Sequence, residues 1–196
     1  SRGLGDVYKR QLRYGTNPKH IRKSDPSGWG WNGTFHAETF ENLLPAKLSF
    51  DYHFKNILSL AEITSGQEIQ CTVLYALSGI SAPSINAEEI FLLASGNVRV
   101  GEIAGTHITI DNRFRPNKSF SSLPKTQKYR KITECSSELA HAEAISGDTI
   151  RIKNTSAQSV SGIDVEIGEL CTIEEVTYKN TIKISDRAVT GKVVKL

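Results

Sequence analysis

Two tryptophans lie close together in a short segment rich in glycine and turn-forming residues. Trp29 and Trp31 are the only tryptophans of the chain, and Asp25 and Asn32 lie beside them. An exposed indole ring can stack on the apolar face of a sugar ring, while nearby carboxylate and amide groups bind its hydroxyl groups. The sequence therefore predicts a glycan-binding loop made of these four residues. The alternative is that the indole rings close one end of the core, because tryptophan is usually largely buried.

A second candidate site is the basic segment 112–131, which contains no acidic residue. Its prolines and serines predict a long loop between strands. Basic side chains interspersed with aromatic ones can bind a polyanion through its phosphate or sulfate groups, and nucleic acid is the weaker form of this hypothesis. A solvated loop is the simplest alternative. The candidate polyanion-binding residues are Arg113, Arg115, Lys118, Lys128 and Arg130.

The net charge gives little support to a nucleic-acid partner. The formal charge is +3 at pH 7, but Ser1–Gln11 contributes three basic residues and one acidic residue, so the rest of the chain carries only +1. The string Gly5–Gln11 is typical of translated sequencing adapters, and we expect Ser1–Gln11 to be such an artefact rather than part of the fold. A genuine basic arm is the alternative.

No motif in the sequence predicts catalysis. The sequence has no nucleophile elbow, phosphate-binding loop or dinucleotide fingerprint, and its histidines lack metal-ligand spacing. We therefore expect no catalytic residue, no metal site and no cofactor. An enzyme stays open as an alternative, since strand-rich folds host many activities. It would be a carbohydrate hydrolase or lyase whose site combines His107 with His53, Asp51 or Arg99.

The segment His141-Ala142-Glu143 is similar to the zinc-binding motif of nucleoside deaminases. That chemistry also needs two thiolates in a Pro-Cys-x-x-Cys turn, which the sequence lacks. We favour a turn of a surface helix at these residues.

The chain has three cysteines, an odd number. Cys71 and Cys171 lie in apolar, strand-like runs, which predicts buried free thiols. A disulfide between them would require that their strands are neighbours.

Short segments with two-residue alternation dominate the sequence after position 47. In the first of them Leu48, Phe50 and Tyr52 alternate with polar residues, as in a half-buried strand. Segment 12–46 is irregular by comparison, with one short helix expected over 34–44 and Thr34 as its N-cap. The further strands are expected over 68–77, 89–95, 97–103, 106–114, 148–154, 162–169, 171–178, 180–186 and 191–196.

These strands predict an all-β fold, an antiparallel β-sandwich or jelly roll over 47–196 that follows the irregular segment 12–46. A parallel sheet is not expected, because parallel strands need long crossover connections and no strand–helix–strand spacing occurs. The segments 66–72, 105–111, 147–153 and 179–185 are alike, but their spacing is irregular, so we expect no repeat protein. No apolar run is long enough to span a bilayer.

Together these features favour a non-catalytic structural or binding module over an enzyme. A virion component, an appendage subunit or an extracellular glycan-binding domain would fit, and a place outside the cell or on a virion surface is favoured. The basic segment 112–131 is followed by a mainly acidic one, 134–175. This separation of charge is compatible with head-to-tail assembly into an oligomer.

Overall fold

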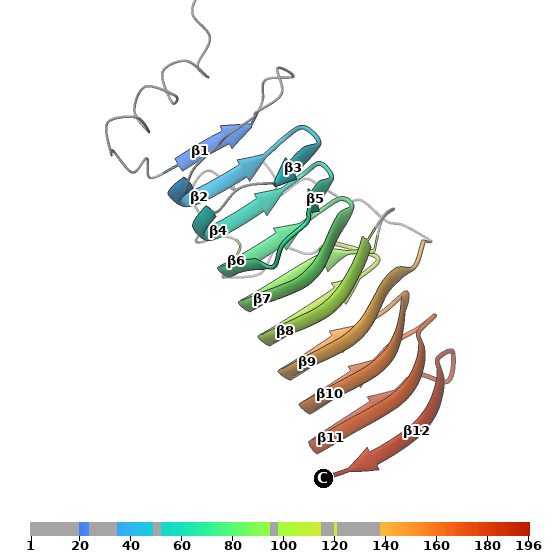
Figure 1. Cartoon of the computed structure of the whole chain (residues 1–196). Coiled ribbons are helices and arrows are strands. Elements are labelled where there is room, and N and C mark those ends of the chain that lie inside the picture. Colours follow the sequence, from blue (N-terminus) through green and yellow to red (C-terminus); the bar gives the residue numbers. More distant parts are fainter. Residues whose placement is uncertain (1–19, 24–34, 49–51, 95–97, 115–119, 121–137) are drawn as a thin grey trace, which may run out of the picture.

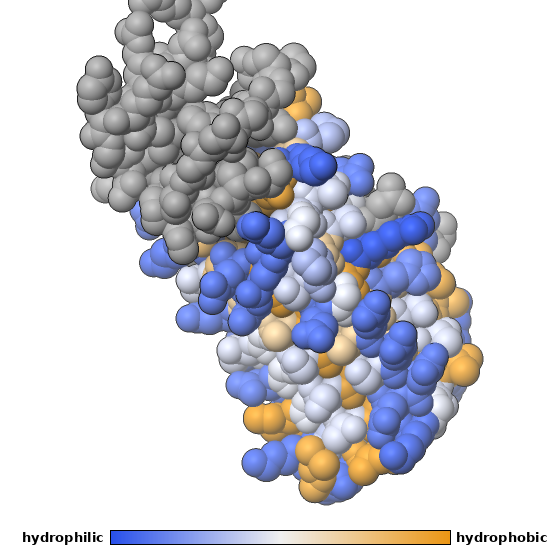
Figure 2. Space-filling model, viewed as in Figure 1, coloured by the Kyte–Doolittle hydropathy of each residue, from blue (hydrophilic) through white to orange (hydrophobic). Residues whose placement is uncertain are grey.

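The strands of the protein pair in parallel and stack into an elongated β-solenoid of about seven turns (Figure 1). In the same view, hydrophilic and hydrophobic residues are interspersed over the surface of the solenoid (Figure 2). The computed structural model describes residues 20–23, 35–48, 52–94, 98–114, 120 and 138–196. Among these residues no helix is long and apolar enough to cross a membrane. The strands are β1 (His20–Lys23), β2 (Phe35–Asn42), β3 (Ala46–Leu48), β4 (Tyr52–Ser59), β5 (Ile63–Ser65), β6 (Ile69–Ala76), β7 (Ile80–Leu93), β8 (Val98–Asp111), β9 (Ala140–Ile152), β10 (Thr155–Ile167), β11 (Thr172–Ile184) and β12 (Val189–Lys195).

The predicted antiparallel sandwich or jelly roll is wrong, because every strand pair in the described part of the chain is parallel. The prediction assumed that parallel strands must be joined by crossover helices, which the sequence lacks. In a solenoid each coil is its own crossover, since the chain circles the core once and returns beside its previous strand. Ala140 pairs with Thr155 and His20 with Thr39, so these circuits take 15 and 19 residues.

Strand β8 shows how a single strand wraps around the core. Its inward side chains are Val98, Val100, Ile103, Ile108 and Ile110, each at most 4% exposed. The two-residue alternation fails twice along this series, once before and once after Ile103. At these points the strand bends, so that side chains from both limbs still face inward. The strands expected at 97–103 and 106–114 are therefore two limbs of one strand.

The second bend lies on a column of small residues. Ala87, Gly105, Gly147 and Gly162 occupy paired positions on β7 to β10. A Cβ atom on Gly147 would lie 2.3 Å from the carbonyl oxygen of Gly105, too close for any side chain. The sequence pattern indicates a turn at each of these three glycines, but the structure places them inside continuous strands.

The interior consists of columns of aliphatic side chains, one from each coil. Ile108, for example, lies between Ile90 and Ile150. These columns explain why 105–111, 147–153 and 179–185 are alike, because the three segments form equivalent rungs. Segment 66–72 belongs elsewhere, since its Ile69 pairs with Ile85 in a different column. The expectation that the chain contains no repeat is wrong.

An insertion, residues 112–139, separates β8 from β9 in the sequence but not in space. The two strands pair directly, with Arg99 opposite His141. Phe114 and Phe120 of the insertion are both buried against the outer side of the solenoid. The Phe120 ring lies 5.0 Å from that of Tyr75, and the Phe114 ring lies 5.1 Å from that of Phe91. We call this set the outer aromatic cluster; its buried members are Leu58, Tyr75, Leu77, Phe91, Leu93, Phe114 and Phe120.

The helix expected over 34–44 is wrong, because Phe35–Asn42 forms strand β2 between β1 and β4. Phe40 stacks on Phe54, with ring centroids 4.9 Å apart. The Asn42 side chain donates a hydrogen bond to Ser59 Oγ at 2.9 Å. Contacts between coils therefore override the local helical signal of this segment.

Cys71 and Cys171 are free thiols, and no disulfide joins them. Cys171 is buried as predicted, whereas Cys71 is only partly buried and packs against the core. Cys71 lies within β6 and Cys171 directly before β11, so they belong to coils that do not adjoin. Burial raises the pKa of Cys71 to about 12 and also raises the pKa of Cys171. Cys135 lies outside the described residues.

We expect both described thiols to resist modification in the native protein. With a pKa of about 12, only about one in ten thousand Cys71 thiols is ionised at about pH 8. The measurement is the labelling rate with an aromatic disulfide reagent on a Cys135→Ser background. Labelling is expected to become fast only after unfolding in guanidinium chloride. Fast labelling of the native protein that Cys71→Ser abolishes would contradict the burial of Cys71.

Candidate functional site

Two rows of outward-facing side chains run along the solenoid axis on the limb that follows the glycine column. Neighbouring rungs of such a ladder are about 4.8 Å apart, so each row presents one side chain at every rung. We call the two rows together the polar face. The first row is Glu89, His107, Thr149, Asp164 and Thr181, and the second is Phe91, Thr109, Arg151, Glu166 and Lys183.

The second row changes character along the axis. Toward the N-terminus it continues from Phe91 through Tyr75 to Leu58, and these three residues belong to the outer aromatic cluster. Toward the C-terminus the Arg151 and Glu166 side chains stay 66% and 49% exposed. Phe114 and Phe120 thus pack on the apolar part of this side of the solenoid, while Arg151 and Glu166 in its polar part are exposed.

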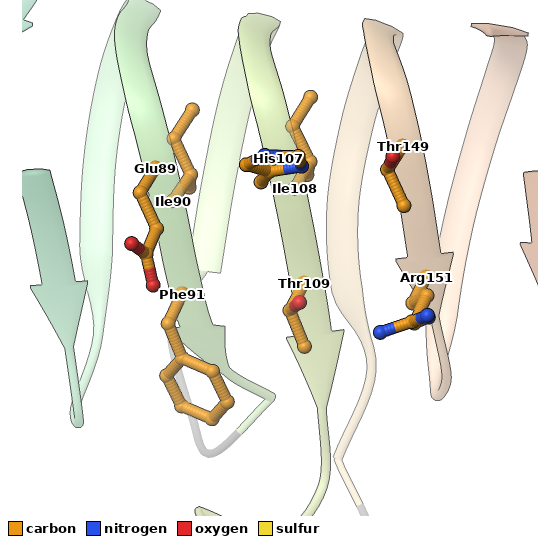
Figure 3. A pocket seen from close by; sticks show the side chains of 8 residues that line it. All are labelled: Glu89, Ile90, Phe91, His107, Ile108, Thr109, Thr149 and Arg151. Atoms are coloured by element: carbon orange, nitrogen blue, oxygen red, sulfur yellow. The ribbon is translucent and has the colours of Figure 1, made fainter. Parts of the chain in front are cut away.

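A shallow pocket of about 250 Å³ lies where the polar face begins. Figure 3 shows Glu89, His107 and Thr149 in one row across β7, β8 and β9, with Phe91, Thr109 and Arg151 in the row beside it. A smaller pocket of about 90 Å³ continues the polar face toward β11. It is lined by Thr149, Arg151, Asp164, Glu166, Thr181 and Lys183, among others.

Hydrogen bonds and an ion pair orient several groups of the polar face. The Tyr75 hydroxyl donates to Glu89 Oε1 at 2.5 Å. Arg151 Nε lies 3.5 Å from Glu166 Oε2. Thr181 and Asn180 both donate to Asp164, and these bonds lower the pKa of its carboxyl group. The carboxylates are therefore held as acceptors at defined positions, between rungs that carry imidazole, hydroxyl or guanidinium donors.

The structure describes few of the site residues expected from the sequence. Trp29, Trp31, Asp25 and Asn32 lie outside the described residues, so the glycan-binding loop stays a prediction. Arg113 is exposed at the start of the insertion, where its backbone N–H donates to Asp111 Oδ1 at 3.2 Å. The other candidate polyanion-binding residues, Arg115, Lys118, Lys128 and Arg130, also lie outside the described part of the chain.

Of the residues expected for an enzyme, the structure describes the side chains of His107 and Arg99, and it places them apart. His107 lines the pocket on the polar face, whereas Arg99 lines a different pocket on the other limb of β8. Asp51 and the side chain of His53 are outside the described structure. The helical turn expected at His141-Ala142-Glu143 is wrong, because these residues lie in β9. Among the described residues, no group of three or more histidine, cysteine, aspartate and glutamate side chains could hold a metal ion.

Sequence reasoning missed Glu89, Thr149 and Arg151 as site residues. The available signal was the likeness of 105–111 to 147–153, which places Thr149 opposite His107 and Arg151 opposite Thr109. Aligned as rungs of one ladder, these segments reveal a shared outward face. Treated as unrelated antiparallel strands, they do not.

Comparison of the chain with protein-family models, curated proteins and solved structures found no match in any of the three. The fold therefore rests on the strand pairing, and function has to be argued from the site.

Proposed function

We propose that this protein is a non-catalytic binding module that holds an extended glycan along the polar face. The observation that carries this proposal is the pair of straight side-chain rows that crosses β7 to β11. A polysaccharide repeats its hydroxyl groups at regular intervals along its length. A ladder that repeats its side chains at every rung, about 4.8 Å apart, is suited to such a ligand.

The charges of the polar face favour a glycan over a nucleic acid. Glu89, Asp164 and Glu166 are acidic, whereas Arg151 and Lys183 are basic, so neither sign dominates. Nucleic-acid sites neutralise phosphates with an excess of lysine and arginine. Sugar hydroxyls both donate and accept hydrogen bonds, and they therefore match a surface that offers both acceptors and donors.

Cleavage of the bound glycan is a second candidate function. Glu89 and His107 occupy paired positions on β7 and β8 and line the same pocket. A carboxylate and an imidazole at neighbouring positions are suitable types of group for general acid–base chemistry. Binding remains the favoured function, since Glu89 Oε1 already accepts the hydrogen bond from Tyr75.

The proposal predicts that His107→Ala weakens glycan binding about tenfold or more, because it removes a donor from the centre of the pocket. A glycan array probed with the full chain identifies the bound polysaccharide, and titration calorimetry then measures its affinity for each variant. Arg151→Ala is expected to have a similar effect.

Arg187→Ala is the matched control, because Arg187 is also an exposed cation paired with a carboxylate, that of Glu169, but lies off the polar face. It should bind within about twofold of the unaltered chain. Binding that His107→Ala and Arg151→Ala leave intact would refute a role for the polar face, as would the absence of any bound glycan. Release of shorter oligosaccharides by the unaltered chain, but not by His107→Ala, would favour cleavage instead.

A further inference from the structure

A third pocket, of about 470 Å³, lies on the opposite limb of β8 and β9 from the polar face. Arg99 and His141 occupy paired positions at its centre, so that a guanidinium group and an imidazole stand side by side. Glu143 lies two residues beyond His141 along β9. This spacing places Glu143 about 6.6 Å farther along the strand. The remaining lining residues are Val100, Gly101 and Ala142.

Backbone packing keeps side chains away from one wall of this pocket. Gly101 lies opposite Glu143 in the ladder, because Val100 pairs with Ala142 and Glu102 with Ala144. A Cβ atom on Gly101 would lie 2.4 Å from the carbonyl oxygen of Pro83. The close approach of β7 therefore restricts this position to glycine. Because Gly101 has no side chain, β8 leaves space beside Glu143.

The charged groups of this pocket have no side-chain partner among the described residues. Arg99, His141 and Glu143 form no hydrogen bond or ion pair through their side chains with any other described residue. Elsewhere on the solenoid, by contrast, Arg151, Lys153, Arg187 and Lys192 each pair with a carboxylate. The pocket thus offers donors at one end and a carboxylate acceptor at the other, all available to a ligand.

The side chains of this pocket determine which chemical groups a bound ligand must carry. An arginine fork binds a carboxylate through two parallel hydrogen bonds, and a histidine can donate a further one. The carboxylate of Glu143 would repel a second anionic group but accepts hydrogen bonds from hydroxyls. A pyranose that bears a carboxylate carries ring hydroxyls several ångströms from that group. It can therefore bind both ends of the pocket, since His141 and Glu143 lie about 6.6 Å apart along the strand.

We propose that Arg99, His141 and Glu143 form a separate binding site for an acidic sugar of the hexuronic acid type. The sugar carboxylate binds Arg99 and His141, and ring hydroxyls donate to Glu143. The site shares no lining residue with the polar face, and it therefore stands or falls independently of the glycan site proposed there.

The test is a titration of the full chain, with labelled histidine side chains followed by nuclear magnetic resonance. Sodium glucuronate is the probe, and glucose and glycine are the comparison ligands at equal ionic strength. Glucuronate is expected to shift the His141 signals in a saturable way at concentrations about tenfold or more below those needed with either comparison ligand. His141→Ala identifies these signals.

Arg99→Gln is expected to weaken glucuronate binding about tenfold or more by removing the charged fork. Arg187→Gln, the same change at an exposed arginine outside both proposed sites, should leave the affinity within about twofold. Retention of binding by Arg99→Gln, equal binding of glycine and glucuronate, or an absence of His141 shifts would each overturn the proposal. None of these outcomes bears on glycan binding to the polar face, which the His107→Ala variant tests.

Discussion

Gly147→Ala is expected to destabilise the protein by about 1–3 kcal/mol or more, although it adds a single methyl group. The new Cβ atom would lie 2.3 Å from the carbonyl oxygen of Gly105, which belongs to the backbone of β8 and cannot rotate away. Strands β8 and β9 must therefore separate locally, which weakens their hydrogen bonds and the contact between Ile108 and Ile150.

Gly66→Ala is the matched control, because a Cβ atom on Gly66 meets nothing within 4 Å. Removing a glycine at an unstrained position stabilises a protein by about 0.4–1 kcal/mol through the unfolded chain. The same chemical change should thus have opposite signs at the two positions in denaturant unfolding. A Gly147→Ala protein as stable as Gly66→Ala would contradict the close stacking of the glycine column.

Hydrogen exchange gives a second readout for the glycine variant. In a solenoid each coil contacts mainly its two neighbours, so a local defect loosens the adjacent interface first. Amides of β8 and β9 should lose protection in Gly147→Ala, whereas those of β6 should keep it. A uniform loss along the whole chain would show that the coils do not unfold as separate units.

Phe120→Ala is expected to cost about 3–5 kcal/mol of stability. Phe120 is fully buried, and its ring packs edge-on against Tyr75 at 5.0 Å and Phe114 at 4.8 Å. Its removal leaves a cavity among the rings of Tyr75 and Phe114. The free energy of denaturant unfolding measures the loss, and hydrogen exchange in β6 and β7 should rise with it.

Two further variants serve as comparisons for the loss of stability in Phe120→Ala. Phe120→Leu keeps an apolar side chain in place and is expected to lose much less stability than alanine. Ile163→Ala removes an apolar side chain that is 38% exposed, and it should change stability far less than a fully buried position does. If Phe120→Ala were no worse than Ile163→Ala, the insertion would add nothing to the stability of the solenoid.

The sequence predicted that strands exist but not how they pair. Alternation in 171–178 and 180–186 correctly indicates extended chain, and all but residues 171, 185 and 186 of these segments lie in β11. Parallel and antiparallel strands show the same alternation. The antiparallel prediction rested on the absence of crossover helices, which parallel strands in a solenoid do not need. The insertion of 112–139 hid the repeat, since it places 105–111 and 147–153 much farther apart than the other equivalent rungs.

The candidate site, like the strand pairing, could be predicted only in part from the sequence. The sequence makes His107 a candidate site residue, but its neighbours Glu89 and Thr149 come from other coils and join it only through the parallel register. Local spacing cannot reveal such a row. Arg99 and His107 look close in sequence, yet the bends of β8 direct them to different sides of the solenoid.

The junction between β8 and β9 also makes the protein a natural scaffold for display. The coils on either side of residues 112–139 stack in unbroken register, so the length of chain between Asp111 and Ala140 does not disturb the core. The entropy cost of lengthening the chain between two paired strands grows only slowly. A foreign peptide grafted after Phe120 would therefore leave the flanking coils intact, provided that Phe114 and Phe120 remain to anchor it.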